Sequence, residues 1–480
     1  MINRVKNTKG LNNVVIKAGI WYVIGNLVMK SINFITMPIF ATIFTVNEFG
    51  MYNIYWAYVT MISLIIPLAL YTSIKNAKYD FKDKLNDYMT SIIFISFVNL
   101  IIFLLCGNLC FGIISSFMEF NRAVFNVLIV QSYSMGIITT ISAYYSVDYK
   151  YKKFLLITFL NSVSGIILSL ILMETIFYNN KFWGRVLGGA IPCAIIASMI
   201  IYSILKKSRV IKKEYCYYGL RISLPIIPHG ISQSILSQFD RILIQKIIGF
   251  FEAGIYSFIY NIGLILQVIA ISLDNAWTPW FYEKMNRKEY KEIEKKSIIY
   301  LDVFFLITVF IITLSPELIK IVAPIEYWSG INLVIPIAIS SYFMFLYTLY
   351  VQIEYFCKKT QFIAMGTIFA AMINIILNLI LIKRFGYKVA AYTTLFSYFI
   401  LFILHRIIAI KMVGFDIFNI KKIIIRITII LSYSIFVSIY INNVLYRYIM
   451  LFIVILISGL QKNNRKIIIQ KIHSLSNIGE

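Results

Sequence analysis

Long apolar runs separated by short polar connections make up almost the whole chain. A helix needs about 20 apolar residues to cross a bilayer, and a barrel strand would alternate apolar with polar positions, which these runs do not. Backbone groups in hydrocarbon must be satisfied within their own segment, so the pattern predicts about fourteen transmembrane helices. The runs lie at residues 16–44, 50–73, 89–110, 123–146, 154–177, 186–205, 222–247, 254–280, 298–315, 330–355, 362–382, 389–404, 423–441 and 444–460.

The composition agrees with this pattern and excludes an ordinary soluble enzyme. Of 480 residues, 60% are apolar and only 14% are charged, and the mean hydropathy is +0.81. Soluble domains average roughly 45–50% apolar and about 25% charged residues. We therefore expect an all-α polytopic membrane protein. The first apolar run, Ile16 to Phe44, is too long for a cleaved signal segment, so we expect it to stay as the first helix.

The charge is strongly basic, and its distribution predicts the topology. The formal net charge is +24, which in a soluble protein would suggest nucleic acid as a partner. However, 34 of the 45 Lys and Arg residues fall in alternate connections, as the excess of cations in cytoplasmic loops requires. We therefore expect both termini in the cytoplasm and no nucleic-acid partner. The connection 383–388, with three cations on the opposite side, is a misfit and suggests a missed or split helix there.

The cysteines and histidines do not predict a metal site or a cofactor. No two cysteines have CxxC spacing, and three histidines spread over the chain give a metal cluster too few ligands. We read the cysteines as small apolar packing residues. The residues concerned are Cys106, Cys110, Cys193, Cys216 and Cys357, with His229, His405 and His473.

A short internal repeat predicts how the helices are grouped. Glu48-Phe-Gly-Met-Tyr52 aligns with Glu252-Ala-Gly-Ile-Tyr256 at an offset of 204 residues, and each copy opens an apolar run. The repeat predicts two six-helix lobes of the same orientation around a central cavity, plus two C-terminal helices. The lobes would be residues 1–205 and 222–410, joined by a cytoplasmic linker at 206–221. Residues 411–480 would form the two extra helices and a cytoplasmic tail.

Two like-oriented lobes around a cavity are the layout of a transporter rather than an enzyme. The connections on the outer side are too short for a catalytic domain, and the first of them offers only Glu48 as a carboxylate. His405 lies beside Arg406 at what we predict to be a cytoplasmic helix end, and His229 has no evident nucleophile to pair with. We therefore expect no catalytic residues.

Several motifs resemble those of polysaccharide repeat-unit flippases. The segment PIIPHGISQSILSQFDR at 225–241, with GIY at 254–256 and NAWTPWF at 275–281, resembles the start of the second lobe in that family. The segments WYVIGN at 21–26, PIF at 38–40 and EFG at 48–50 resemble its first helix and turn. The family comprises the Wzx-type members of the multidrug/oligosaccharidyl-lipid/polysaccharide (MOP) exporter superfamily, and the resemblance extends over nearly the whole chain.

This resemblance implies movement of a lipid-linked oligosaccharide, carried on undecaprenyl pyrophosphate, from the inner to the outer leaflet of a bacterial inner membrane. Such a step belongs to O-antigen, lipopolysaccharide or capsule biosynthesis. The implied partners are membrane lipids, a polysaccharide polymerase and a chain-length regulator. Coupling to an H⁺ or Na⁺ gradient and bias by the membrane potential alone both stay open as energy sources. A pyrophosphate head cannot cross about 30 Å of hydrocarbon unaided, so the cavity should be polar and partly cationic.

Two cations remain after the loops are counted, and they are our candidates for contact with an anionic cargo. They are Lys30, midway along the first run, and Arg241, near the end of the seventh. A charge within a membrane span is costly unless it faces a cavity or a partner. For Arg241 the structural alternatives are an ion pair with Asp240 or extension of the side chain to the surface. Aromatic residues at helix ends mostly mark the interface, but Tyr55 and Trp56 are candidates for stacking on sugar rings.

The seventh and eighth runs also carry candidates for ion coupling and for bending. Asp274 has no adjacent cation, so burial would favour its protonated form, whereas Asp240 has Arg241 beside it. Hydrogen-bonded packing is the structural alternative for both. His229 lies next to Pro228 and more readily marks a broken helix than a proton relay. Pro225 and Pro228 together predict a hinge, with a static kink as the alternative.

Two other functions remain open from the sequence. A multidrug/cation antiporter of the same superfamily would favour an acidic, aromatic cavity, against which Lys30 and Arg241 argue. A membrane polysaccharide polymerase would need a larger outer loop than the chain provides.

Overall fold

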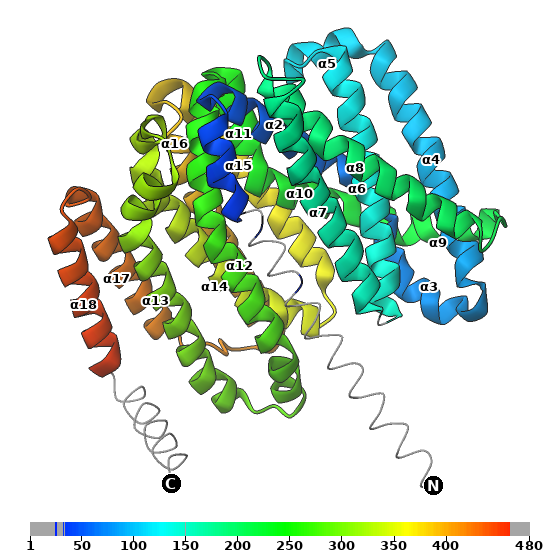
Figure 1. Ribbon diagram of the computed structural model, residues 1–480. Helices are drawn as coiled ribbons and strands as arrows, with labels where there is room; N and C mark the ends of the chain where they lie inside the picture. The colour runs from blue at the N-terminus through cyan, green and yellow to red at the C-terminus, as the bar shows by residue number, and fades with distance from the viewer. Residues whose placement is uncertain (1–24, 26–31, 33, 149, 461–480) are drawn as a thin grey trace, which may run out of the picture. The chain divides into compact units, whose positions relative to one another are not determined.

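The protein is helical throughout the residues that the computed structural model describes, which are 25, 32, 34–148 and 150–460 (Figure 1). No strand occurs in these ranges. Short 3₁₀ segments lie at Leu70–Ser73 (η1), Lys82–Lys84, Leu224–Ile226 (η3) and Ile325–Leu333. The α-helices are α2 (Val46–Ile65), α3 (Ile74–Asp80), α4 (Leu85–Leu109), α5 (Phe111–Met118), α6 (Arg122–Val147), α7 (Tyr151–Glu174), α8 (Lys181–Leu205), α9 (Lys213–Ser223), α10 (Ile227–Ser234), α11 (Asp240–Ile247), α12 (Phe250–Asn286), α13 (Tyr290–Val322), α14 (Val334–Phe356), α15 (Thr360–Phe385), α16 (Val389–Val413), α17 (Ile420–Ile439) and α18 (Val444–Leu460).

The predicted polytopic membrane protein is confirmed. Ten helices are long and apolar enough to cross a membrane, and a bent pair made by α2 with η1 and α3 gives an eleventh. Of the remaining predicted spans, the first is described mainly as a short apolar helix, Phe34–Ile43, and the last as another, Val444–Ile457. The seventh is divided among α9, η3, α10, a π-helical turn and α11.

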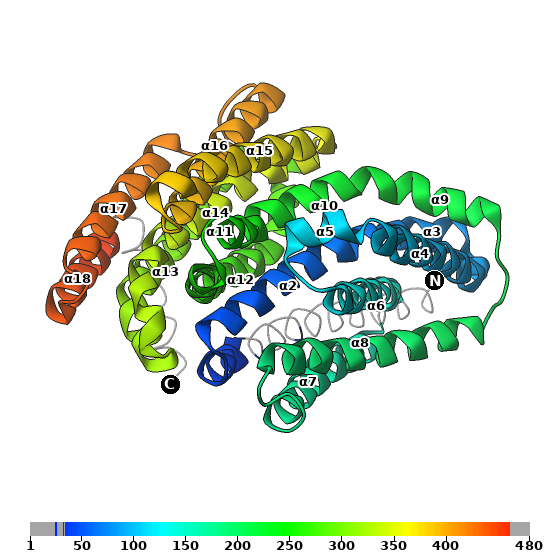
Figure 2. The same cartoon turned by 90° about the horizontal axis from the view of Figure 1, so that it is seen from above.

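The chain divides into two compact units, Met1–Ser257 and Phe258–Glu480. In the first, α6 packs against α2, α4 and α8, and α7 packs along α8 (Figure 2). Helix α9 packs on α4 and η1, whereas α10 and α11 pack on α2. Residues 222–257, which the repeat assigned to the second lobe, fall within the first of these compact units, and the predicted lobe boundaries stay a prediction.

The second apolar run is broken at Pro67, which the sequence alone did not predict. The axis bends by 47° between α2 and the η1–α3 segment, and Leu68 and Ala69 have positive φ of 57° and 46°. Asn99 on α4 donates its amide to the carbonyls of residues 65 and 66, at 3.3 and 2.8 Å. These contacts satisfy acceptors that the break frees, which a membrane interior requires.

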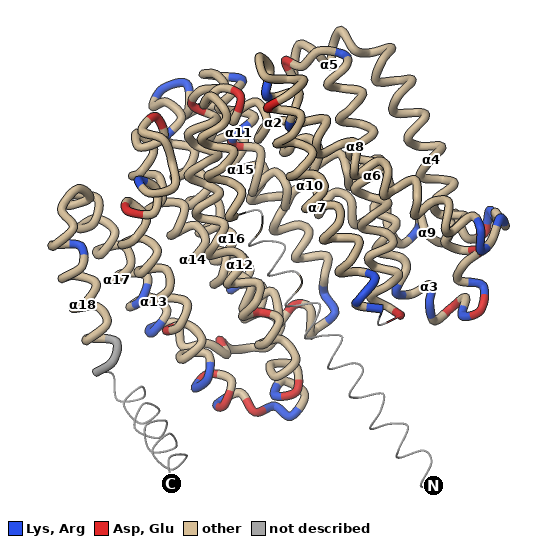
Figure 3. The backbone as a smooth tube through the Cα atoms, viewed as in Figure 1, with Lys and Arg blue, Asp and Glu red and all other residues tan. Residues whose placement is uncertain are grey.

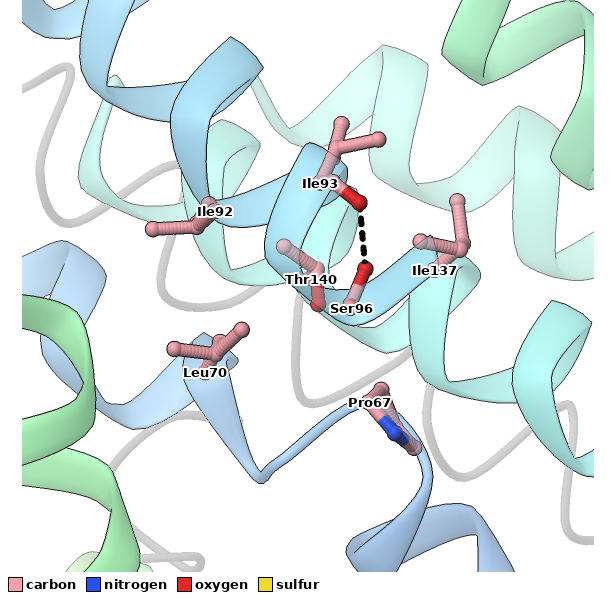
Figure 4. A pocket seen from close by; sticks show the side chains of 7 residues that line it. All are labelled: Pro67, Leu70, Ile92, Ile93, Ser96, Ile137 and Thr140. Atoms are coloured by element: carbon pink, nitrogen blue, oxygen red, sulfur yellow. Dashed lines mark hydrogen bonds between the residues drawn. The ribbon is translucent and has the colours of Figure 1, made fainter. Parts of the chain in front are cut away.

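A shallow hollow lies beside the break at Pro67, and it has no space for a water molecule (Figure 4). Its two hydroxyl groups bond to carbonyls of their own helices, Ser96 to Ile93 at 2.7 Å and Thr140 to Gly136 at 2.8 Å. The hollow therefore offers no free polar group and no room for a ligand. Its walls are Pro67, Leu70, Ile92, Ile93, Ser96, Ile137 and Thr140.

In the second unit α14 is the central helix. It packs along α16 and also against α13 and α15, and α15 packs along α16. Helices α17 and α18, which correspond to the two predicted extra helices, both pack on α13 (Figure 2).

Two ion pairs with buried arginines join these last helices to α13. Arg426 on α17 donates through Nε to Oδ1 of Asp302 at 2.7 Å. Arg447 on α18 donates through Nη1 to Oε2 of Glu317 at 2.9 Å. The two arginine side chains are 4% and 1% exposed. The sequence count had assigned both arginines to loops, and this was wrong, because they lie within α17 and α18. Hydropathy along the chain does not reveal that a carboxylate on a distant helix neutralises a charge.

Most other charges lie at helix ends and connections, as Figure 3 shows. The misfit connection 383–388 contains no missed or split helix, because α15 ends at Phe385 and α16 begins at Val389. Lys383 and Arg384 occupy the last turn of α15, where cations interact favourably with the helix dipole. Gly386, with φ of 76°, ends the helix.

The two glycines of the internal repeat lie against each other within the first unit. A Cβ atom on Gly50 would stand 2.1 Å from the carbonyl oxygen of Phe250, and one on Gly254 would stand 2.3 Å from that of Val46. Each contact joins a repeat glycine to the residue four positions before its counterpart. The repeat at an offset of 204 residues is thus a nearly symmetric close crossing of α2 and the start of α12.

Substitution of Gly50 by alanine should weaken this crossing. The added methyl group meets a backbone oxygen that cannot rotate away, so we expect a loss of about 1–3 kcal/mol in unfolding free energy. Thermal unfolding of the purified protein would measure it. Gly112→Ala is the matched control, since a Cβ there has no heavy atom within 4 Å. Equal stability of the two variants would contradict the close crossing.

Neutralisation of Asp302 should destabilise the C-terminal helices. Asp302→Asn leaves the Arg426 guanidinium buried without its counter-charge, which typically costs about 3–5 kcal/mol. Glu283→Gln removes an exposed carboxylate that pairs with Arg287, and should change the unfolding free energy by at most about 1 kcal/mol. Replacing both members of the pair, with Asp302→Leu and Arg426→Met, should recover most of the loss. Similar unfolding temperatures for Asp302→Asn and Glu283→Gln would refute this account.

Candidate functional site

Polar contacts tie together the start of α2 and the start of α8 in the first unit. Thr45 and Glu48 form a capping box, in which the side chain of each residue accepts a hydrogen bond from the backbone N–H of the other. The Oε1 atom of Glu48 also accepts from the backbone N–H of Lys181 at 3.1 Å, and Lys181 donates through Nζ to the carbonyl of Ile43 at 3.1 Å. The only carboxylate of the predicted first outer turn is thus used to fix that turn.

Arg185 on α8 is a cation that the sequence count missed. Its guanidinium lies over the ring of Phe40 at 3.9 Å and near that of Tyr52 at 4.8 Å. Its Nη1 atom donates to the hydroxyl of Ser169 at 2.9 Å. No ion pair among the described residues includes Arg185. The sequence placed it in an outer loop, whereas it lies in the second turn of a membrane-spanning helix, half-buried and without a carboxylate partner.

The candidate sugar-stacking residues, Tyr55 and Trp56, lie on α2 one turn after Tyr52, whose ring is near Arg185. Tyr55 is fully buried and donates its hydroxyl to Oε1 of Gln131 at 2.5 Å. Its ring meets those of Phe120 and Phe182 edge-on, both at 6.3 Å between centroids. Trp56 is half-buried. Tyr55 therefore belongs to an aromatic cluster of the first unit in this conformation, and stacking on a sugar stays a prediction for both residues.

The seventh predicted span is irregular where its prolines fall. Pro225 is the second residue of the 3₁₀ segment η3, and Pro228 lies in the first turn of α10. A π-helical turn, Ile235–Phe239, then precedes α11. His229 lies directly after Pro228, within this interrupted stretch, and its interpretation as the mark of a broken helix rather than a proton relay stays a prediction. Whether the two prolines act as a hinge stays a prediction.

Asp240 and Arg241 are both buried at the start of α11, each 2% exposed. Asp240 accepts at Oδ2 from the hydroxyl of Tyr256, at 2.7 Å, and Arg241 donates through Nη1 to the side-chain oxygen of Gln238. Tyr256 is part of the repeat motif that contains Gly254. The coupling role of Asp240 and the cargo role of Arg241 stay predictions. Lys30, the other candidate cation, lies outside the described residues.

In the second unit, Asp274 faces an amide rather than a cation. Gln352 on α14 donates through Nε2 to both carboxylate oxygens of Asp274, at 3.1 and 3.0 Å. The neighbouring Trp277 stacks on Tyr300 at 4.7 Å. These hydrogen bonds bring no cation to Asp274, just as no cation is adjacent to it in sequence, and its coupling role stays a prediction.

A second titratable group in this unit was misplaced by the sequence. His405 does not lie at a helix end, because α16 continues for two more turns to Val413. Its side chain is fully buried, and its Nδ1 atom is 2.6 Å from Oε1 of Glu354 on α14. The adjacent Arg406 had suggested an interfacial position, but Arg406 instead donates to Asp416 at 2.9 Å. A lone histidine in an apolar run gives no signal of a carboxylate 51 residues away.

A ladder of buried amides and hydroxyls joins α15 to α16. Asn378 donates to Asn374 at 3.2 Å, and Asn374 donates to Thr394 at 3.2 Å. Thr393 donates its hydroxyl to the side-chain oxygen of Asn378. All four side chains are 2% exposed or less. Interhelical hydrogen bonds of this kind fix the packing of membrane helices.

No group of three or more His, Cys, Asp and Glu side chains that could hold a metal ion occurs among the described residues. The polar side chains therefore form several separate networks within each unit. Those of the first unit centre on Arg185 and on Asp240, and those of the second on Asp274, His405 and the α15–α16 ladder.

Comparison with known proteins gives a family and a fold. Residues 15–285 match a family described as polysaccharide biosynthesis protein. Among solved structures, the lipid II flippase MurJ in an inward closed conformation is similar, with a TM-score of 0.70 and 16% identity. The alignment covers 92% of this chain and 98% of MurJ. No curated protein sequence matches at a significant level.

Transporters of other specificity share the same fold. An inward-facing multidrug resistance MATE family transporter of the MOP superfamily gives a TM-score of 0.65 at 13% identity, covering 82% of this chain and 98% of that one. A MOP superfamily transporter from Pyrococcus furiosus gives 0.59 at 12% identity, covering 84% and 95%. At these identities the similarity concerns the fold alone, so it does not distinguish a lipid-linked cargo from a drug.

Proposed function

The chain belongs to the polysaccharide biosynthesis protein family, and from this membership we propose that it is a flippase for oligosaccharide linked to undecaprenyl pyrophosphate. It would move repeat units from the cytoplasmic to the outer leaflet of a bacterial inner membrane by alternating access, during synthesis of O-antigen or capsule. Both termini would lie in the cytoplasm. A polysaccharide polymerase and a chain-length regulator would act on the product.

The single observation that carries this proposal is the unneutralised charge of Arg185. Arg426 on α17 and Arg447 on α18, by contrast, each meet a carboxylate of α13. A cation in a membrane helix that lacks a carboxylate partner is costly, unless it meets an anion for part of the cycle. The guanidinium suits phosphate oxygens, because its planar N–H groups match them in geometry. Phe40 and Tyr52 supply aromatic rings beside it, and aromatic faces also suit sugar rings.

The charge of the cargo also suits export. A pyrophosphate carries about two negative charges, and its outward movement through an inside-negative potential releases about 2.3 kcal/mol per charge for each 100 mV. Coupling to an H⁺ or Na⁺ gradient, with Asp274 and Asp240 as carriers and His229 as a weaker candidate, forms part of the proposal. Lys30 and Arg241 remain candidates for contact with the pyrophosphate.

The same fold supports a second candidate, a multidrug antiporter. A cationic drug would be repelled by Arg185, which favours the anionic cargo. A membrane polysaccharide polymerase has no supporting contact among the described residues.

The proposal predicts the effect of deleting the gene for this protein in its bacterial host. Lipid-linked repeat units should accumulate in the inner leaflet, and surface polysaccharide should be lost. Extraction and labelling of lipid-linked sugars, together with staining of surface polysaccharide, would measure both. Unchanged polysaccharide with increased drug sensitivity would instead indicate the antiporter.

Re-expression of variants would then test Arg185. Arg185→Gln removes a charge-assisted hydrogen bond worth about 1.5–3 kcal/mol, so export should fall about tenfold or more at equal protein level. Arg122→Gln is the matched control, because Arg122 is exposed at the first turn of α6 and contacts the Phe111 ring. Full export by Arg185→Gln would exclude a cargo role for that residue.

A further inference from the structure

Glu354 and His405 form an acid–base pair that has no access to water. Both side chains are 0% exposed, and Nδ1 lies 2.6 Å from Oε1. The pair lies where α14 packs along α16, in the centre of the second unit. Neither the flipping of an anionic lipid nor the candidate residues discussed above uses this pair.

The charge of such a pair depends on a single proton. A neutral imidazole beside a carboxylate leaves a net charge of −1 in the protein interior, whereas one added proton makes the pair neutral overall. An uncompensated buried charge costs several kcal/mol. Among the described residues, neither Glu354 nor His405 forms an ion pair with any other charged group, so the added proton is the nearest means of compensation.

The surroundings close the site on the remaining sides. A Cβ atom on Gly366 of α15 would stand 2.8 Å from Nε2 of His405, so the backbone of α15 covers that edge of the ring. The ring also stacks on Tyr347 at 5.7 Å. The Nε2 atom of His405 and the Oε2 atom of Glu354 have no hydrogen-bond partner among the described residues.

The neighbouring charged groups do not replace the proton. Arg406, the next residue on α16, pairs with Asp416. The other titratable groups near the pair are uncharged tyrosine and cysteine side chains, together with one lysine at the turn between α14 and α15. They are Tyr347, Tyr355, Cys357, Lys359 and Tyr398.

We propose that Glu354 and His405 form a proton-binding site, which holds one proton as an imidazolium–carboxylate pair while α14, α15 and α16 are packed together. Separation of these helices would admit water to Nε2 and Oε2. Water would stabilise the separate charges and let the proton leave His405 for solvent. Proton binding therefore favours the packed arrangement, and proton release accompanies its opening. If the chain transports as proposed above, the site supplies H⁺ coupling through a pair distinct from Asp274.

The dependence of stability on pH tests the site without any transport. An unfolded histidine loses its proton above about pH 6.5, whereas the folded pair would keep it. The unfolded chain then binds fewer protons, so the unfolding equilibrium constant should rise by up to about tenfold per pH unit above pH 6.5. In Glu354→Gln, His405 should be neutral when folded. The rise of the unfolding equilibrium constant above pH 6.5 should then be absent from this variant. Its unfolding free energy should instead fall as the pH drops below 6.5, because the unfolded histidine binds a proton that the folded one does not.

Denaturant unfolding of the full chain in detergent micelles, from pH 5 to 9, would give both profiles. Glu283→Gln is the control, because Glu283 is exposed and pairs with an exposed arginine, and its profile should follow that of the unchanged protein. The result that overturns the proposal is a Glu354→Gln profile parallel to that of the unchanged protein above pH 6.5.

A second measurement covers the case in which Glu354→Gln does not fold. The chain has only three histidines, so nitrogen-15 NMR of histidine-labelled protein contains three imidazoles. His229→Gln and His473→Gln identify the remaining signal as His405. Its two ring nitrogens should both carry protons at pH 8, and a singly protonated ring there would overturn the proposal. Neither measurement involves polysaccharide, so a failure here is distinct from a failure of the proposed flippase function.

Discussion

The absence of water from the bilayer interior is the constraint on which the rest of this structure depends. It requires each backbone group and each charge inside a span to find its partner within the protein. Arg426 and Arg447 meet carboxylates on α13, and these two contacts determine where the C-terminal helices pack. The same requirement explains why Asn99 donates to the carbonyls that the break after α2 leaves free. In these three places, a side chain from another helix either accepts or donates the missing hydrogen bond or supplies the opposite charge.

Close helix packing depends on small residues at chosen places. The crossing at Gly50 and Gly254 brings backbone against backbone. A Cβ atom at either position would stand only 2.1 to 2.3 Å from a carbonyl oxygen, so both positions favour glycine. Because both glycines occupy equivalent places in a repeat, a single motif duplicated along the chain produces a nearly symmetric contact. Gly366 acts in a similar way in the second unit, where it lets α15 approach the imidazole of His405. In both places the missing side chain determines which groups become neighbours.

The distribution of paired and unpaired charges connects the fold to the proposed transport. Paired charges such as Arg426 with Asp302 serve packing, since neither can leave without exposing the other. Arg185 has aromatic rings and a hydroxyl around it but no carboxylate among the described residues, so its charge is available to an anion. Glu354 and His405 differ from both cases, because the charge of the pair changes with one proton. Subtraction of loop cations identified Lys30 and Arg241 as unassigned charges, but it missed Arg185, Arg426 and Arg447. Those three lie near span ends, where a hydropathy boundary uncertain by a few residues cannot separate a loop cation from a helical one.

The sequence by itself determined the class of the protein, most of its spans and its family. Hydropathy is summed over about 20 residues and needs no knowledge of neighbours, so ten long helices appear at the predicted places. The repeat was also visible, because equivalent glycines require equivalent flanking residues. Only the tertiary structure decided which unit contains residues 222–257, where the second span breaks, and which charges are paired. Each of these depends on contacts between residues far apart in the chain, such as Glu354 with His405, and a one-dimensional pattern does not contain the distance between them.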